Sequence, residues 1–502
     1  MIPIAIIIAL TAVAAFVADV FRKPHRCIYC YLLVRFLFPK TLTMDLGGGE
    51  VILLWRAAET IQFCLLLLVV AAKWRMIVPR LNLFPAIRSF FLMFVAAFGI
   101  STVLPLALEV TGIRRRGLDV SLMRELFLAT HYFFAIGVFL AAIMFLDSLS
   151  KVRGLLKCLV ACGVVGLLDV SLFYFLDPSH TIREATTGAS GGFGGLAFGS
   201  PDLLSRVAVF AFFAALGLGQ LTGTRFYYWL GACFFLPVMV AASRPVLVSL
   251  LLALLLYLYA TRPEKKDESK RRVPLVPATV LLIGLFLPWG VMAFQAEGNA
   301  IHWVEDVTRR EDFFSPDVGV LSRLAVWYRA ADVLRETFPF GTGGGMLPYY
   351  MAPTKGSTVA SHFVGFLPVR STAFVEQMYE RTLTDLFTSV HNTYIEFIVE
   401  NGLGGIILCG WFGLLVLRGF KRLGSSQPPL AGEAKSTLVA ILFMLLAAWL
   451  NVMTDSTVKI YWFYATLLYA VQFLSSQTAD GSAGAGLAPS VAGHGLPGDR
   501  RF

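Results

Sequence analysis

Charged residues are scarce in this chain, and acidic residues are scarcer than basic ones. Only 15% of its 502 residues are Asp, Glu, Lys or Arg, whereas 57% are hydrophobic. A soluble domain of this composition would leave much apolar surface in water, so the soluble globular classes are excluded. The composition therefore predicts a polytopic membrane protein of the all-α class.

Cysteine is also rare, at seven residues spread along the chain. Cys27 and Cys30 form a C-x-x-C, but no second pair follows at zinc spacing. Most other cysteines lie within apolar runs, where they are expected to pack against neighbouring helices. The sequence therefore predicts no metal and no redox site. Because the basic residues that give the net charge of +10 fall mostly between apolar runs, it also predicts no nucleic-acid partner.

About twelve apolar runs are long enough, or nearly so, to cross a bilayer. They are residues 2–20, 51–72, 88–109, 125–147, 154–175, 203–221, 226–242, 245–260, 275–294, 403–418, 437–453 and 458–475. The run Cys30–Phe38 is too short to span alone and is interrupted by Arg35. It is interfacial, re-entrant or an additional span.

Lysine and arginine gather in every second loop, as expected for loops that face the cytoplasm. They predict that residues 73–87, 148–153 and 261–274 are cytoplasmic, and that both termini are cytoplasmic as well. Alternation then places residues 21–50, 110–124, 176–202 and 295–402 outside. The last of these loops is far longer than a connection needs, which indicates a function.

These features divide the chain into four parts. Residues 1–294 are expected to form a transmembrane bundle of about nine helices, and residues 295–402 a long outer loop with amphipathic helices that is a candidate for the functional region. Residues 403–475 add further spans, and the Gly-, Ala- and Ser-rich residues 476–502 form a disordered cytoplasmic tail.

The stretch "SVHNTYIEFIVENGLGG" places a histidine at the mouth of a late span. Asn392 or Ser389 is suited to cap the helix that starts there. His391 then lies at the positive end of a helix dipole, which favours a neutral imidazole that can accept a proton. The alternative is an interfacial histidine without chemistry.

A second stretch, "LSRLAVWYRAADVLRETFPFGTGGG", predicts an amphipathic helix that ends near Pro339. Its apolar positions at helical spacing are Leu321, Leu324, Tyr328 and Ala331. Arg323 and Arg329 project from this helix, either to bind an anion or as solvated surface residues. The glycines that follow match no P-loop, because no Gly-Lys-Ser/Thr is present.

Other arginines stand out by position. Arg244 lies in a tight outer turn between two spans, where it either snorkels to the interface or binds phosphate through its planar fork. Arg114, Arg115 and Arg116 break the charge rule in an outer loop, either as a tolerated exception or as a site for anionic headgroups or phosphate.

Two further polar features lie within spans. Arg56 and Glu59 are three residues apart and are expected to pair with each other. His131 is interpreted as a structural histidine.

Together the stretch around His391, residues 321–345 and the turn at Arg244 resemble the O-antigen ligase and O-antigen polymerase superfamily. His391-Asn392, nine residues, Gly402, two residues and Gly405 match the pattern of its ligases, and polymerases begin with a similar His-Asn-x-Tyr-x-Glu. Arg323 and Trp327 occupy the positions of an arginine–tryptophan helix that precedes a proline and glycines. Arg244 matches a Ser-Arg-Gly turn in which Pro245 replaces the glycine, so the local backbone differs. The resemblance covers residues 200–420 well, and the N-terminal half only in architecture.

The resemblance implies a GT-C-like fold of about 12 transmembrane helices in the bacterial inner membrane, with a large periplasmic loop between the ninth and tenth. It implies a metal-independent, inverting glycosyltransferase without cofactors. The donor is a glycan on undecaprenyl pyrophosphate, and the acceptor is lipid A–core in lipopolysaccharide biosynthesis or another glycan. His391 takes the role of general base, and Arg244 and Arg323 stabilise the departing pyrophosphate. Arg329, Asn392 and Glu396 are expected to contact or orient substrate.

Three functions stay open from the sequence. The chain is an O-antigen ligase, a polymerase of the same superfamily, or a non-enzymatic transporter of a lipid-linked glycan. A transporter is expected to line a cavity with charge through several spans. Here the notable charges gather at one face and in one outer loop, which favours chemistry at the surface.

Overall fold

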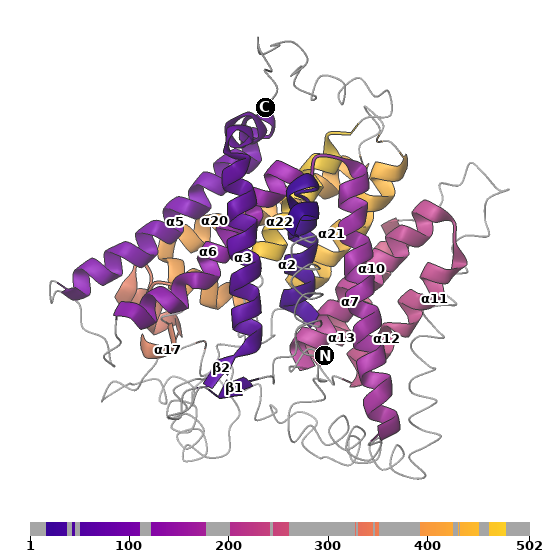
Figure 1. Ribbon diagram of the computed structural model, residues 1–502, viewed down its shortest axis with the longest axis horizontal. Coiled ribbons are helices and arrows are strands. Elements are labelled where there is room, and N and C mark those ends of the chain that lie inside the picture. Colours follow the sequence, from indigo (N-terminus) through magenta and orange to yellow (C-terminus); the bar gives the residue numbers. More distant parts are fainter. Residues whose placement is uncertain are drawn as a thin grey trace, which may run out of the picture.

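The computed structural model describes about three fifths of the chain. The described residues are 17–37, 43–45, 51–110, 122–176, 201–240, 244–260, 327, 330–344, 347–350, 392–424, 430, 432–450 and 461–477. They are helical apart from turns and one antiparallel hairpin of two short strands, β1 (Thr43–Asp45) and β2 (Val51–Leu53). The all-α class is therefore confirmed for this part of the chain, with the hairpin as an addition that the sequence did not predict (Figure 1).

The helices follow the apolar runs closely, because a helix satisfies its own backbone in lipid. They are α2 (Arg26–Leu37), α3 (Leu54–Ala72), α4 (Ile77–Leu83), α5 (Pro85–Val110), α6 (Leu122–Phe145), α7 (Leu149–Leu176), α10 (Pro201–Thr222), α11 (Arg225–Cys233), α12 (Phe235–Val240), α13 (Arg244–Ala260), α17 (Leu347–Tyr350), α20 (Thr393–Gly424), α21 (Gly432–Leu450) and α22 (Tyr461–Ser475).

Within the described ranges, five helices are long and apolar enough to cross a membrane. A sixth is counted if Ala58–Ala72 and Trp74–Leu83, which are bent by 70°, form one broken span. The chain is thus a multi-pass membrane protein. The larger number of about twelve spans stays a prediction, because the runs 2–20 and 275–294 lie mostly or wholly outside the described residues.

Helix α10 is the centre of the bundle and packs against α7, α21 and α11. Small residues allow these helices to approach closely. A Cβ added at Gly163 of α7 would lie 2.4 Å from the Cβ of Ala211, and one added at Gly217 of α10 would lie 2.5 Å from the Cβ of Ala440. The α7–α10–α21 contact therefore excludes even one additional methyl group.

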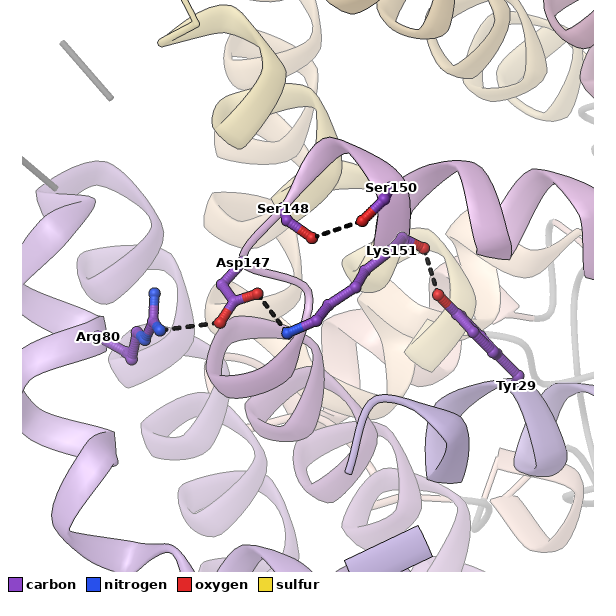
Figure 2. Close-up of polar contacts among 6 residues, drawn as sticks. All are labelled: Tyr29, Arg80, Asp147, Ser148, Ser150 and Lys151. Atoms are coloured by element: carbon purple, nitrogen blue, oxygen red, sulfur yellow. Dashed lines mark hydrogen bonds and ion pairs between the residues drawn. The ribbon is translucent and has the colours of Figure 1, made fainter. Parts of the chain in front are cut away.

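One end of the bundle is held by ion pairs, and we call it the basic end. Arg80 donates to Asp147 at 2.9 Å, and Lys151 pairs with the same carboxylate (Figure 2). Arg153 pairs with Glu433, so the start of α7 meets the start of α21. Because residues 73–87 and 148–153 meet here, this is the end that the charge distribution assigns to the cytoplasm.

The start of α2 also lies at the basic end, which corrects one part of the predicted topology. The Tyr29 hydroxyl donates to the backbone oxygen of Lys151 (Figure 2). Residues 21–29 therefore lie beside residues 148–153 and not on the opposite side, as alternation predicted for the whole of 21–50. The run that contains Arg35 belongs to a largely buried helix that leads from the basic end toward the hairpin. Alternation failed because this helix is too short to be counted as a span.

Glu59 forms an ion pair with Arg35, a residue of another helix. It accepts a hydrogen bond from Tyr31 at 3.0 Å, and its carboxylate lies 3.3 Å from Nε of Arg35. Both side chains of the ion pair are almost fully buried, at 5% and 2% exposed. The predicted partner, Arg56, has no described side chain. The pair joins α2 to α3, because a buried carboxylate in an apolar bundle requires a nearby cation.

Candidate active site

The first turn of α20 is built as the sequence predicts. The Asn392 side-chain oxygen accepts hydrogen bonds from the backbone N–H groups of Tyr394 and Ile395, both at 3.0 Å. These contacts make Asn392 the N-cap of α20, because they satisfy two donors that have no partner in the helix. Asn392 is itself only 2% exposed. The cap lies at the opposite end of the bundle from the basic end, since Arg422 near the end of α20 contacts Ser475 there.

Helix α20 is longer than the span predicted from residue 403, and it changes direction at Gly402. This glycine has φ +57° and ψ −133°, in the left-handed half of the backbone map that residues with a side chain rarely adopt. A Cβ at this position would lie 2.1 Å from the backbone oxygen of Pro339. Gly402 therefore serves both the change of direction and the close approach of another segment.

That second segment is the glycine-rich loop after the predicted amphipathic helix. Thr342 and Gly343 donate their backbone N–H groups to the backbone oxygens of Val399 and Glu400, each at 3.0 Å. In return, the Leu403 N–H donates to the Pro339 oxygen at 2.8 Å.

We call this contact, in which residues 337–344 dock onto residues 399–403, the glycine joint. Gly341 has φ +81°, and a Cβ there would lie 2.4 Å from the Glu400 oxygen. Gly341 and Gly402 thus allow main chain to meet main chain.

The helix before the glycine joint packs on α20 through its tryptophan face. Residues 330–337 are helical, and a small apolar cluster joins this helix to α17 and α20. The cluster consists of Ala330, Val333, Leu347, Tyr350 and Val399, with Trp327, Leu334 and Ile395 against it. The predicted apolar stripe was wrong at the position that can be checked, because Ala331 is exposed. The helix instead packs on α20 through the neighbouring face, which carries Trp327, because this side chain offers the larger apolar area.

Arg244 is brought to the same end of the bundle as the cap of α20. It is the first residue of α13, and Val246 and Ser249 of the next turns line a small cavity together with Arg206 and Tyr464. Tyr464 also lines a larger apolar cavity of about 120 Å³ that reaches Thr393 and Tyr394 in the first turn of α20.

Aromatic side chains form most of the wall of this larger cavity. They are Phe90, Phe94, Tyr394, Phe397, Phe412, Trp449, Tyr461 and Tyr464. One cavity contains residues from the first turns of α13, and the adjoining one contains residues from the first turn of α20. The starts of these two helices therefore converge.

Several predicted site residues lie outside the described residues. They are His391, Arg323, Arg329, Arg114, Arg115 and Arg116, and the side chain of Arg244 is likewise not described. Glu396 is described: it is 5% exposed and lies one turn after the cap, on the face of α20 that carries Glu400.

The structure adds a polar network that sequence reasoning missed. The Tyr132 hydroxyl donates to Glu400 at 2.6 Å and accepts from the Asn401 side-chain nitrogen at 3.0 Å. The Ser101 hydroxyl donates to the Asn401 side-chain oxygen, also at 3.0 Å. The signal available in the sequence was the presence of these polar residues within apolar helices. His131, which is adjacent to Tyr132, was singled out from the sequence, and Tyr132 itself was not considered.

Comparison with known proteins agrees with this arrangement. A family model described as O-antigen ligase matches residues 229–410. That segment contains the Arg244 turn, the Trp327 helix, the glycine joint and the His391-Asn392 pair. No curated protein matches the chain. Residues 229–410 are thus similar to the O-antigen ligase family, which supports membership of the O-antigen ligase superfamily.

Proposed function

We propose that this protein is a membrane glycosyltransferase that moves a glycan from undecaprenyl pyrophosphate to an acceptor hydroxyl. It acts in the bacterial inner membrane, with the glycine joint and the start of α20 on the outer side and both termini in the cytoplasm. The acceptor is lipid A–core or a related surface glycan, as expected of an O-antigen ligase.

The observation that carries this proposal is the glycine joint. Its three backbone hydrogen bonds tie the helix that follows Arg323 to the helix that follows His391. Two segments that are distant in sequence are thereby held within main-chain contact. A general base and a pyrophosphate-binding arginine need such a fixed relation, because catalysis depends on groups held close to their reactive geometry.

The proposed reaction is a single displacement at the anomeric carbon. His391 accepts the proton of the acceptor hydroxyl, whose oxygen forms the new bond to that carbon. The bond from the carbon to the phosphate oxygen breaks, and its electron pair leaves with undecaprenyl pyrophosphate. Arg244 and Arg323 stabilise the negative charge that develops there, and Arg329 supplies a further phosphate contact. The reaction inverts the anomeric configuration and needs neither a metal nor a nucleotide.

The aromatic cavity beside Tyr394 supports a lipid-linked donor. Its wall is almost entirely apolar, and one side of it is the first turn of the capped helix α20. A polyprenyl chain is an apolar occupant, whereas the helix N-terminus favours a nearby anion. The lipid and the pyrophosphate of one donor thus fit adjoining parts of the structure.

The test is transfer by the purified protein in lipid vesicles. Given a glycan on polyprenyl pyrophosphate and an acceptor, the protein should form product in the presence of EDTA and without nucleotide triphosphate. A reaction abolished by EDTA and restored by divalent metal would contradict the metal-free mechanism. A donor that crosses the bilayer without being consumed would instead establish the transporter.

Variants at matched expression assign the roles. His391→Ala should lower the transfer rate at least about 100-fold, and His391→Lys should not rescue it, because a charged lysine cannot accept the proton. Arg244→Lys and Arg323→Lys should keep partial activity, since lysine retains the charge but loses the bidentate fork. His25→Ala and Arg75→Lys, at the basic end, are the matched controls. If His391→Ala keeps more than about a tenth of the rate, His391 is not the general base.

Polymerase activity is the second candidate, because the His-Asn-x-Tyr-x-Glu start of α20 fits both branches of the superfamily. Offering the two acceptors in competition distinguishes them. A ligase transfers to lipid A–core, whereas a polymerase extends a second lipid-linked glycan.

A further inference from the structure

Tyr132 is the point at which four other parts of the protein meet. It lies on α6, is fully buried, and stacks between the rings of Phe98 at 4.8 Å and Tyr461 at 5.4 Å between centroids. A Cβ at Gly344 would lie 2.6 Å from the Tyr132 ring, so the loop of the glycine joint rests against it. Its hydroxyl reaches α20 through Glu400 and Asn401. The ring and the hydroxyl together contact α5, α20, α22 and the glycine-rich loop.

Glu400 connects this network to the glycine joint directly. Its side chain accepts from Tyr132, while its backbone oxygen accepts from Gly343 at 3.0 Å. The neighbouring Asn401 bonds Tyr132 and Ser101, and Gly402 follows at the change of direction. One residue thus holds the helix to α6 on one side and the glycine-rich loop to the helix on the other.

The burial of Glu400 indicates that its hydrogen bond with Tyr132 serves to orient α20. The residue is 0% exposed, and a carboxyl group in such a place costs free energy even when it is hydrogen-bonded. An apolar pair of similar size would pack α6 against α20 without that cost. What the hydrogen bond adds is direction, because a 2.6 Å contact fixes the rotation of α20 about its axis far more tightly than apolar packing does.

We propose that Tyr132 and Glu400 are a positioning pair that fixes the start of α20, and with it His391 and Asn392, relative to the glycine joint. Neither residue touches substrate. The inference rests on the proposed function, since it assigns to the pair a share of the transfer rate. The pair acts through the orientation of the helix and leaves substrate binding largely unchanged.

Steady-state kinetics of the full-length protein in vesicles tests the pair, with the folded fraction measured for each variant. Tyr132→Phe should lower kcat about 10- to 100-fold and change KM for the lipid-linked donor less than about twofold, because small displacements of catalytic groups cost rate more than binding. Glu400→Gln should keep most of the activity, since its amide oxygen still accepts from Tyr132. Glu400→Leu should lose as much as Tyr132→Phe, and the double variant should lose little more than either one.

Two further variants serve as controls that distinguish a positioning role from a loss of folding. Ser101→Ala removes the hydroxyl that contacts Asn401 and the Phe98 backbone oxygen, and it should lower kcat only about two- to fivefold because the Tyr132–Glu400 bond stays intact. Tyr469→Phe removes the hydroxyl from an equally buried tyrosine of α22 and should leave kcat unchanged.

A Tyr132→Phe protein whose folded fraction falls while kcat per folded molecule stays at the wild-type value would overturn the proposal and make the pair structural. An increase in KM at constant kcat would overturn it as well. If the folded wild-type protein transfers nothing, the proposed function fails and the positioning role falls with it.

Discussion

The two ends of the bundle are held together by different chemistry. At the basic end, partly exposed ion pairs link Arg80 to Asp147 and Arg153 to Glu433. At the other end, the glycine joint and the Tyr132 network use main-chain contacts and fully buried hydrogen bonds. Exposed ion pairs are weak and are screened by salt, whereas buried contacts with no room for a methyl group tolerate little change. We therefore expect the fold to tolerate substitutions at the basic end and to tolerate few at the end where the proposed chemistry takes place.

The largest expected loss of stability comes from a substitution in the glycine joint. Gly402→Ala should destabilise the protein strongly, because a left-handed residue with a Cβ costs about 1–2 kcal/mol before the clash with the Pro339 oxygen is added. Gly410→Ala is the matched control in the same helix, since nothing lies within 4 Å of its added Cβ. Thermal unfolding in detergent should show a large loss for the first variant and none for the second. Equal melting temperatures would mean that the joint does not constrain α20.

A smaller but still large effect is expected at the buried ion pair between α2 and α3. Glu59→Leu leaves Arg35 buried without its carboxylate, and breaking a buried ion pair in this way costs about 3–5 kcal/mol. Replacing both residues by apolar ones should recover much of the loss. Unfolding of the single and double variants measures this recovery. A double variant no more stable than Glu59→Leu would show that the carboxylate has partners more important than Arg35.

The ion pairs of the basic end should respond weakly. Asp147→Asn removes the acceptor shared by Arg80 and Lys151, whose side chains are roughly a fifth to a third exposed. The expected loss is at most about 1 kcal/mol, and it should shrink further as salt is raised to about 1 M. Unfolding measured at low and high salt checks both statements. A loss comparable with that of Glu59→Leu would abolish the contrast between the two ends.

The smallest effect is a pH dependence at the basic end. Burial, assisted by the charge of Lys151, lowers the pKa of His25 from its ordinary 6.5. The folded state thus takes up a proton less readily than the unfolded state, so this contribution to stability is complete above pH 6.5. It decreases as the pH falls from 6.5 toward the lowered pKa. His25→Gln should flatten the melting-temperature profile in that range, and an unchanged profile would assign the dependence to other groups.

The sequence predicted those parts of the structure that depend on local pattern. Apolar runs located the helices, and the asparagine cap of α20 followed from the preference of helix ends for such side chains. Ala331 was placed on the wrong face because the tryptophan that selects the face has its partners on α20 and α17. The ion pair of Glu59 with Arg35 was not predicted, because Arg35 belongs to a run too short to be recognised as a span. The contacts of Tyr132 with Glu400 and Asn401 join residues far apart in the sequence, and no local pattern announces them.

The main-chain character of the glycine joint also makes it visible to isotope exchange. The amide hydrogens of Thr342, Gly343 and Leu403 are its donors, and two of the three belong to a loop, where amides ordinarily exchange with solvent fast. As long as the joint is closed, these three should exchange as slowly as the interior of a helix. Each opening event lets them exchange together, so their common rate reports how often residues 337–344 separate from residues 399–403. Because the exchanging hydrogens belong to the backbone, the opening rate can be measured without changing or labelling any side chain.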